Sequence, residues 1–151
     1  MKIKPEVTVK LTGLRVFSKK LDARKRQAFA KWNLRYRAYI QKRWVKYSRG
    51  GGDWPALKYR KGSILRDTST LFAAMAPTLS PPPGSVANIQ RDGVIVGFGG
   101  GGSHPGGPTI SELAYWHHTG AGNLPERELI VEPDETTMKG MRADMDRVLN
   151  S

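Results

Sequence analysis

The sequence contains no cysteine, and this absence excludes several kinds of chemistry. Without thiols the chain has no disulfide framework, thiolate zinc site, iron–sulfur cluster or cysteine nucleophile. No stretch approaches the roughly 20 consecutive apolar residues of a membrane-spanning helix, and the N-terminus lacks the apolar segment of a secretory signal. We therefore expect a protein made in a reducing cytosol, with no membrane partner.

Acidic residues are scarce, and most of them lie in the second half of the chain. The 151 residues include 25 Lys and Arg but only 13 Asp and Glu, which gives a net charge of +12. Residues 1–66 carry 20 of the basic residues and 3 of the acids, whereas acids outnumber bases in residues 67–151. This polarity indicates that the basic part meets an anionic partner, or that opposite ends of neighbouring copies attract each other.

The apolar pattern predicts an α+β fold in a single domain, 1–151. A short strand is expected over 5–11, ending at Gly13, because β-branched residues alternate there. A long helix is expected over about 18–47, with Ser18 as its N-cap. This helix is predicted from large apolar residues that recur every three or four positions: Phe29, Trp32, Tyr36, Ile40, Trp44 and Tyr47.

The second half of the chain alternates short periodic segments with turn signals. We expect the long N-terminal helix and a C-terminal helix to pack on a small antiparallel sheet, with extended loops or arms. The expected elements are a short helix capped by Asp67 or Thr68, a hairpin of 86–90 and 94–98, a helix over 110–118, a strand over 129–131 and a last helix opened by Pro133, Asp134 and Glu135.

Two segments are too rich in glycine, proline and charge to pack as regular elements. Residues 50–62 cannot be helical through Pro55, and residues 99–108 include four consecutive glycines. We expect both segments to be arms that become ordered on assembly. The residues expected to act in these arms are Trp54, Leu57, Tyr59, Lys61 and His104.

The residues form no familiar catalytic or cofactor pattern. The glycine run 99–102 lacks the Gly-Lys-Ser/Thr sequence of a phosphate-binding loop. His117 and His118 are adjacent, so they cannot both face one metal ion from a regular element. Ser103 and Ser111 lie in no nucleophile-elbow pattern. We therefore predict a protein that is not an enzyme and that uses no cofactor, metal or small-molecule substrate.

The expected long helix carries a nearly unbroken series of cations. Between Lys19 and Arg49 the only acid is Asp22, whereas a solvated helix face usually carries both signs. An anionic partner is therefore expected, either DNA bound without sequence specificity or an acidic protein surface. The cations expected to face this partner are Lys19, Lys20, Arg24, Lys31, Arg35, Lys42 and Arg43.

Several short motifs occur in an order that is similar to that of a known family. Ile64 to Leu71 is followed by a hairpin that ends in Val96-Gly97, then by Ala114 to Gly120 and by Leu124 to Leu129. This order resembles the phage virion morphogenesis family, which comprises tail-completion and head–tail joining proteins of tailed bacteriophages. The positions that match the family motifs are Leu65, Asp67, Thr68, Leu71, Gly97, Ala114, His117, Gly120, Pro125 and Arg127.

The resemblance implies a structural virion protein at the head–tail neck, assembled in the cytoplasm of the host bacterium. Such a protein completes or terminates the tail and joins it to the head as an oligomeric ring, with a hexamer as the expected form. The implied partners are copies of itself, neighbouring neck and tail-tube proteins, and phage DNA in the lumen. The basic helix taken alone favours the alternative, a non-specific nucleic-acid-binding protein.

Overall fold

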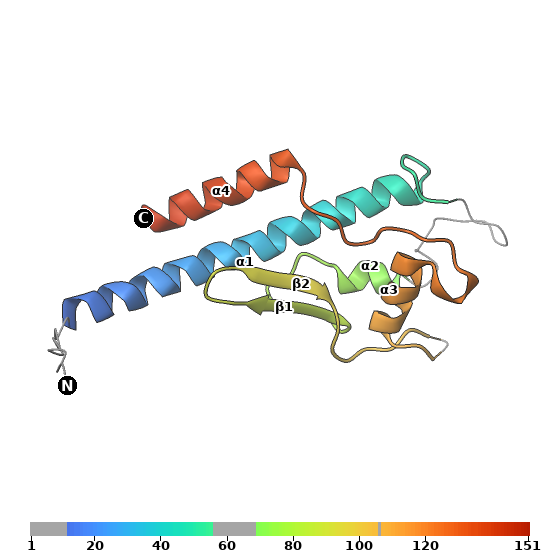
Figure 1. Cartoon of the computed structure of the whole chain (residues 1–151), viewed down its shortest axis with the longest axis horizontal. Helices are drawn as coiled ribbons and strands as arrows, with labels where there is room; N and C mark the ends of the chain where they lie inside the picture. Colours follow the sequence, from blue (N-terminus) through green and yellow to red (C-terminus); the bar gives the residue numbers. More distant parts are fainter. Residues whose placement is uncertain (1–11, 56–68, 106) are drawn as a thin grey trace, which may run out of the picture.

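A single long helix organises the computed structural model, which describes residues 12–55, 69–105 and 107–151 (Figure 1). The elements are α1 (Thr12–Ser48), α2 (Thr70–Ala74), β1 (Ser85–Ile89), β2 (Val94–Phe98), α3 (Ile110–Thr119), the 3-10 turn η1 (Ala121–Asn123) and α4 (Glu135–Leu149). The predicted α+β class is confirmed, because a long N-terminal helix and a C-terminal helix accompany a two-stranded antiparallel sheet.

Helix α1 is longer at its N-terminus than the sequence predicted. Because the helix begins at Thr12, the prediction of Ser18 as N-cap is wrong, and Gly13 is helical rather than the end of a strand. The strand expected over 5–11 lies outside the described residues. At the other end the prediction is confirmed: α1 ends at Ser48, and Gly50 adopts the left-handed φ of 81° that favours glycine after a helix.

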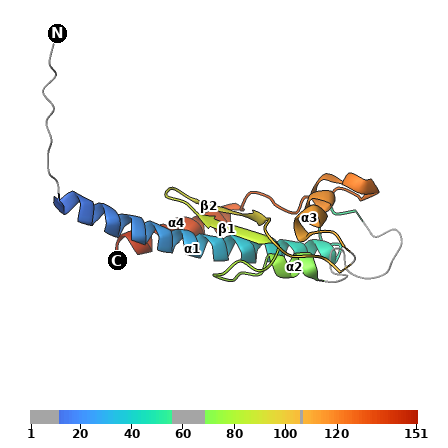
Figure 2. The ribbon, with the colours of Figure 1, turned by 90° about the horizontal axis from the view of Figure 1, so that it is seen from below.

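Helix α4 packs antiparallel along α1, while the hairpin lies on another side of α1 (Figures 1 and 2). Trp32 Nε1 donates to Met141 O over 2.7 Å, and Arg24 donates to Leu149 O over 3.2 Å. The expectation that α4 packs on the sheet is thus refined, because α1 is its main partner. Asp134 caps α4, as the acidic start of this helix predicted, by accepting from the backbone N–H of Thr137.

The hairpin packs on α1 through aromatic stacking. The predicted hairpin is confirmed, with β1 beginning one residue earlier than expected, and its register runs from Ser85 opposite Phe98 to Ile89 opposite Val94. The ring of Phe98 lies parallel to that of Trp44, with centroids 6.0 Å apart. A two-stranded sheet is marginal by itself, so this contact with α1 contributes much of its stability. The core around Trp44 also contains Ile40, Trp54, Leu71, Ala74, Met75, Ile110, Ala114 and Leu129.

Residues 99–108, except the undescribed 106, form a loop that backbone hydrogen bonds hold to the body. Gly99 N donates to Gly84 O over 3.1 Å, and Ile110 N donates to Gly102 O over 3.2 Å. A side chain at Gly102 would collide with the backbone of Gly84, so the close approach depends on glycine. The loop is therefore attached to the body at both ends through its glycines, and its role as an assembly arm stays a prediction.

Arg37 is fully buried on the core side of α1, and it links three elements. Its Nε donates to Asn33 Oδ1 over 2.7 Å, one Nη donates to Ala74 O over 3.0 Å and the other to Val86 O over 3.1 Å. These acceptors belong to α1, to the end of α2 and to β1. Burial lowers the pKa of Arg37 below its usual range. The Arg37 guanidinium thus donates hydrogen bonds to carbonyl groups of α2 and the hairpin, Ala74 O and Val86 O.

We predict that Arg37→Met destabilises the fold by on the order of 3 kcal/mol, because it leaves buried carbonyl acceptors without a donor. Urea denaturation followed by far-UV circular dichroism measures the free energy of unfolding. Exposed Lys31 on the same helix provides the control, and Lys31→Met should change stability by less than about 0.5 kcal/mol. Equal stability of the two variants would show that Arg37 does not hold these elements together.

Candidate functional site

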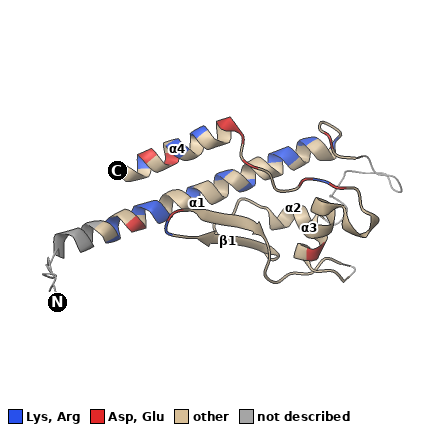
Figure 3. Cartoon of the chain, viewed as in Figure 1, with Lys and Arg blue, Asp and Glu red and all other residues tan. Residues whose placement is uncertain are grey.

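Basic residues recur along α1 (Figure 3). We call those that share one exposed face of the helix, together with Arg49 just after it, the basic stripe. Its members recur at intervals that place them on one face of a helix, and all are exposed. Asp22, the only acid in the sequence of α1, lies on a different side of the helix by the same spacing. The basic stripe consists of Lys20, Arg24, Lys31, Lys42, Lys46 and Arg49.

The structure divides the seven predicted partner-facing cations into two groups. Lys19, Lys20, Arg24, Lys31 and Lys42 are exposed, as a partner-facing role requires. Arg35, although exposed, pairs with Asp144, and Arg43 pairs with Glu128, so the charges of these two residues are balanced within the chain. Lys46 and Arg49, which were not among the seven predicted partner-facing cations, are exposed on the same side.

Arg35 pairs with a buried carboxylate on α4. Its Nε and Nη lie 2.9 and 2.8 Å from Asp144 Oδ2, and the Asp144 side chain is only 5% exposed. Arg147 adds a longer contact of 3.7 Å to the other oxygen of Asp144. A buried carboxylate without its cation is costly, so charge reversal at Arg35 would disturb the contact between α1 and α4. Nothing in the sequence spacing marked Asp144 as the partner.

A segment that we call the strap, residues 126–132, crosses α1 in an extended conformation without forming a strand. The predicted strand over 129–131 is therefore wrong. Side chains of α1 take the place of a neighbouring strand: Trp44 Nε1 donates to Leu129 O over 2.9 Å, and the Tyr36 hydroxyl donates to Val131 O over 2.9 Å. Arg43 donates to Glu128 O over 2.6 Å. The apolar residues of the strap predicted a strand. Its carbonyl groups instead accept hydrogen bonds from side chains of α1 rather than from a neighbouring strand.

Both adjacent histidines of α3 have structural contacts with the strap. His118 Nδ1 accepts from Leu129 N over 3.1 Å, which requires the neutral ring to carry its proton on Nε2. His117 O accepts from Arg127 N over 2.7 Å, and its Nδ1 lies 3.4 Å from an Arg127 Nη. In the described parts of the chain, no group of three or more His, Asp or Glu side chains is arranged to hold a metal ion.

Residues that match the family motifs gather at one end of the molecule. Leu71 and Ala114 are in the core, and buried Arg127 donates to Pro125 O and Pro55 O. Gly120 ends α3 with a φ of 72° at a point where a Cβ would lie 3.1 Å from the backbone of Glu126. Gly97 differs, because a side chain there would meet open space. Leu65, Asp67 and Thr68 lie outside the described residues, and the N-cap position of α2 is Ser69, so the prediction that Asp67 or Thr68 caps this helix is wrong.

The first predicted arm is only partly described. Trp54 is 8% exposed and packs edge-on against Tyr47, with ring centroids 5.5 Å apart, so it belongs to the core rather than to a free arm. The glycine and proline residues around Trp54 had suggested an arm, but the large apolar ring of Trp54 is buried against the core. Leu57, Tyr59 and Lys61 lie outside the described residues. His104, in the other predicted arm, is half-buried, and its backbone N–H donates to Pro108 O.

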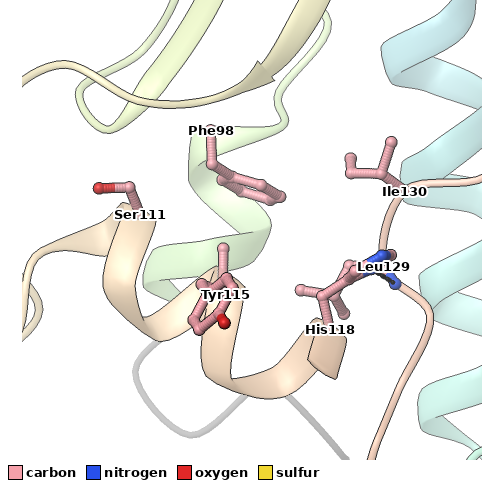
Figure 4. A pocket seen from close by; sticks show the side chains of 7 residues that line it. Phe98, Ser111, Tyr115, His118, Leu129 and Ile130 are labelled. Carbon is pink, nitrogen blue, oxygen red and sulfur yellow. Dashed lines mark hydrogen bonds between the residues drawn. The ribbon is translucent and has the colours of Figure 1, made fainter. Parts of the chain in front are cut away.

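A small pocket opens between α3, β2 and the strap (Figure 4). Its volume of about 230 Å³ is below the usual range for small-molecule sites, roughly 300 to 1,000 Å³. Phe98 and Tyr115 face each other across it, and His118 already accepts a hydrogen bond from the strap. The pocket therefore gives little support to a small-molecule substrate. It is lined by Phe98, Ser111, Ala114, Tyr115, His118, Leu129 and Ile130.

No protein-family model, curated protein or solved structure matches this chain. The resemblance drawn from the sequence motifs therefore stays a prediction. Among the described helices, none combines the length and the apolar character needed to cross a membrane.

We predict that Tyr36 makes stability depend on pH in the alkaline range. Burial, with a smaller contribution from Tyr39, raises the pKa of Tyr36 from 10.0 to about 12. Because the pKa is higher in the folded state, the stabilisation is complete below pH 10 and is lost as pH rises through about 12. Urea midpoints of the wild type and Tyr36→Phe should therefore converge between these two pH values. Parallel pH curves for the two proteins would contradict the buried donor role of the hydroxyl.

Proposed function

We propose that this chain is a structural virion protein at the head–tail neck of a tailed bacteriophage. Copies of the chain would form a ring that completes or terminates the tail and joins it to the head. Neighbouring neck and tail-tube proteins would contact the ring, and assembly would take place in the bacterial cytoplasm. The role needs no catalytic group, cofactor or metal.

The observation that carries this proposal is the clustering of the family-matching residues. Motifs that are far apart in the sequence, from Leu71 to Arg127, meet around the end of α3 and the Trp54-Pro55 segment. Gly120 and Arg127 have roles there that depend on residue type, namely a left-handed backbone and buried donation to carbonyl groups. Residues that maintain a shared fold are expected to cluster in this way, which supports the resemblance.

The shape of the chain also suits contact between copies. The N-terminal turns of α1 extend past α4 and the hairpin (Figures 1 and 2). An isolated helical segment of this kind is marginal in water, and a neighbouring molecule would stabilise it. Exposed carboxylates lie on the strap and at the start of α4, at a distance from the basic N-terminal end of α1. A head-to-tail contact between two copies would therefore pair this basic end with the carboxylates of the neighbouring copy. These carboxylates are Glu126, Glu128, Glu132, Asp134 and Glu135.

We predict that the nuclease-treated protein forms a discrete ring, alone or on addition of tail or neck partners. Size exclusion with light scattering at low and at high salt measures the native mass. A ring closed by opposite charges should dissociate more readily as salt rises, because exposed charges are screened. Complete nuclease treatment keeps DNA-bridged aggregates from being mistaken for rings.

A stable monomer or dimer that ignores tail and neck partners would contradict the proposal. If that same species binds DNA with an affinity that falls steeply as salt rises, the alternative of a free-standing nucleic-acid-binding protein is favoured. The basic stripe is the observation that supports this alternative.

A further inference from the structure

We propose that the basic stripe of α1 binds duplex DNA through its phosphate groups, without reading base sequence. The inference depends on the exposed surface of α1, so it goes beyond the neck assembly and does not require it. Its six members are exposed, and the opposite side of α1 packs against the hairpin and α2. Helix α4 runs beside the stripe, where Arg24 donates to Leu149 O.

The dimensions of the stripe suit an extended polyanion. Lys20 and Lys46 are 26 positions apart on one continuous helix, which corresponds to about 39 Å at 1.5 Å per residue, and Arg49 follows just after the helix ends. Duplex DNA presents one negative charge per roughly 1.7 Å of its axis, so several phosphates lie within reach of such a line. A rigid row of flexible cations can therefore contact several phosphates at once.

The cations of the stripe are available for a partner. Within the described residues, Lys20, Lys31 and Lys46 have no ion pair. Arg24 donates one hydrogen bond to Leu149 O and remains exposed. Lys42 is near enough to Asp134 to contribute weakly to the lowered pKa of that carboxyl. No carboxylate of α1 interrupts the stripe; the acidic residues beside it, Asp134 and Asp144, belong to the N-cap and body of α4.

The composition of the stripe favours DNA over an acidic protein. Protein interfaces are centred on buried aromatic and apolar side chains, and lysine is depleted in them. The large aromatic residues of α1 are instead turned toward the core, α4 or the strap: Trp44 is 1% exposed, and Trp32 and Tyr36 donate to Met141 and Val131. Between the cations lie Gln27 and Ala38, which are exposed but small or polar. Phosphate contacts, in contrast, need little besides Lys and Arg.

The test measures binding of a fluorescent mixed-sequence DNA duplex by anisotropy over a series of salt concentrations. The stripe variant is K20Q/K31Q/K46Q. The control variant, R91Q/K139Q/R142Q, removes the same number of exposed charges from the hairpin turn and α4. A third variant, K20R/K31R/K46R, restores the charges. All six positions are exposed, and circular dichroism confirms that each variant is folded before binding is measured.

We expect log K to fall linearly with log salt for the wild type, by about 0.9 for each phosphate contact. The stripe variant should reduce this slope by about two to three, while the control and the arginine variant keep the wild-type slope within about 0.5. Equal effects of the stripe and control variants would overturn the proposal, because only net charge would then matter. Absence of salt-dependent DNA binding in the wild type would also overturn it.

Two further probes separate DNA from other anionic partners. Poly-glutamate represents an acidic protein surface, and vesicles of mixed phosphatidylglycerol and phosphatidylcholine represent an anionic membrane. We expect the wild type to bind DNA more tightly than either probe at the same salt concentration. Tighter binding of poly-glutamate or vesicles, lost in the stripe variant, would assign the stripe to that partner and contradict the DNA proposal.

Discussion

The structure depends on hydrogen bonds that side chains of α1 donate to the backbone of the other elements. Arg37 reaches Ala74 and Val86, Trp44 reaches Leu129, and Tyr36 reaches Val131. A two-stranded sheet and an extended strap cannot satisfy all of their own carbonyl groups, and buried carbonyls without donors are costly. The long helix therefore acts as both an apolar surface and a supply of donors for the rest of the chain.

This arrangement divides the helix into two functional sides. The aromatic residues and Arg37 are used by the fold, and Arg35 and Arg43 are engaged by carboxyl or carbonyl oxygens of α4 and the strap. The basic stripe contains cations that form no ion pair in the described part of the chain, Lys20, Lys31 and Lys46 among them. A high density of like charge on one face destabilises the free chain, and an anionic partner would relieve that repulsion. Both the ring and the DNA proposal draw on this surface.

Local patterns in the sequence predicted most elements but not the contacts that tie them together. The three-to-four spacing of Phe29 to Trp44 and the Asp92-Gly93 turn predicted α1 and the hairpin, because both signals are local. Burial of Arg37 could have been suspected, since it is in phase with Ile40 and Trp44 on the apolar stripe. The roles of Asp144 and the strap depend on partners more than 30 positions away, which no local pattern reveals.

The central claim is that one side of α1 builds the fold while the basic stripe remains open to bind DNA. Acetylation of lysines in the native protein, with and without duplex DNA, followed by mass spectrometry, tests this claim at single residues. We predict that DNA protects Lys20, Lys31, Lys42 and Lys46 severalfold, while Lys139 on α4 reacts at the same rate in both conditions. Uniform protection of all these lysines, or protection of Lys139 alone, would contradict the account.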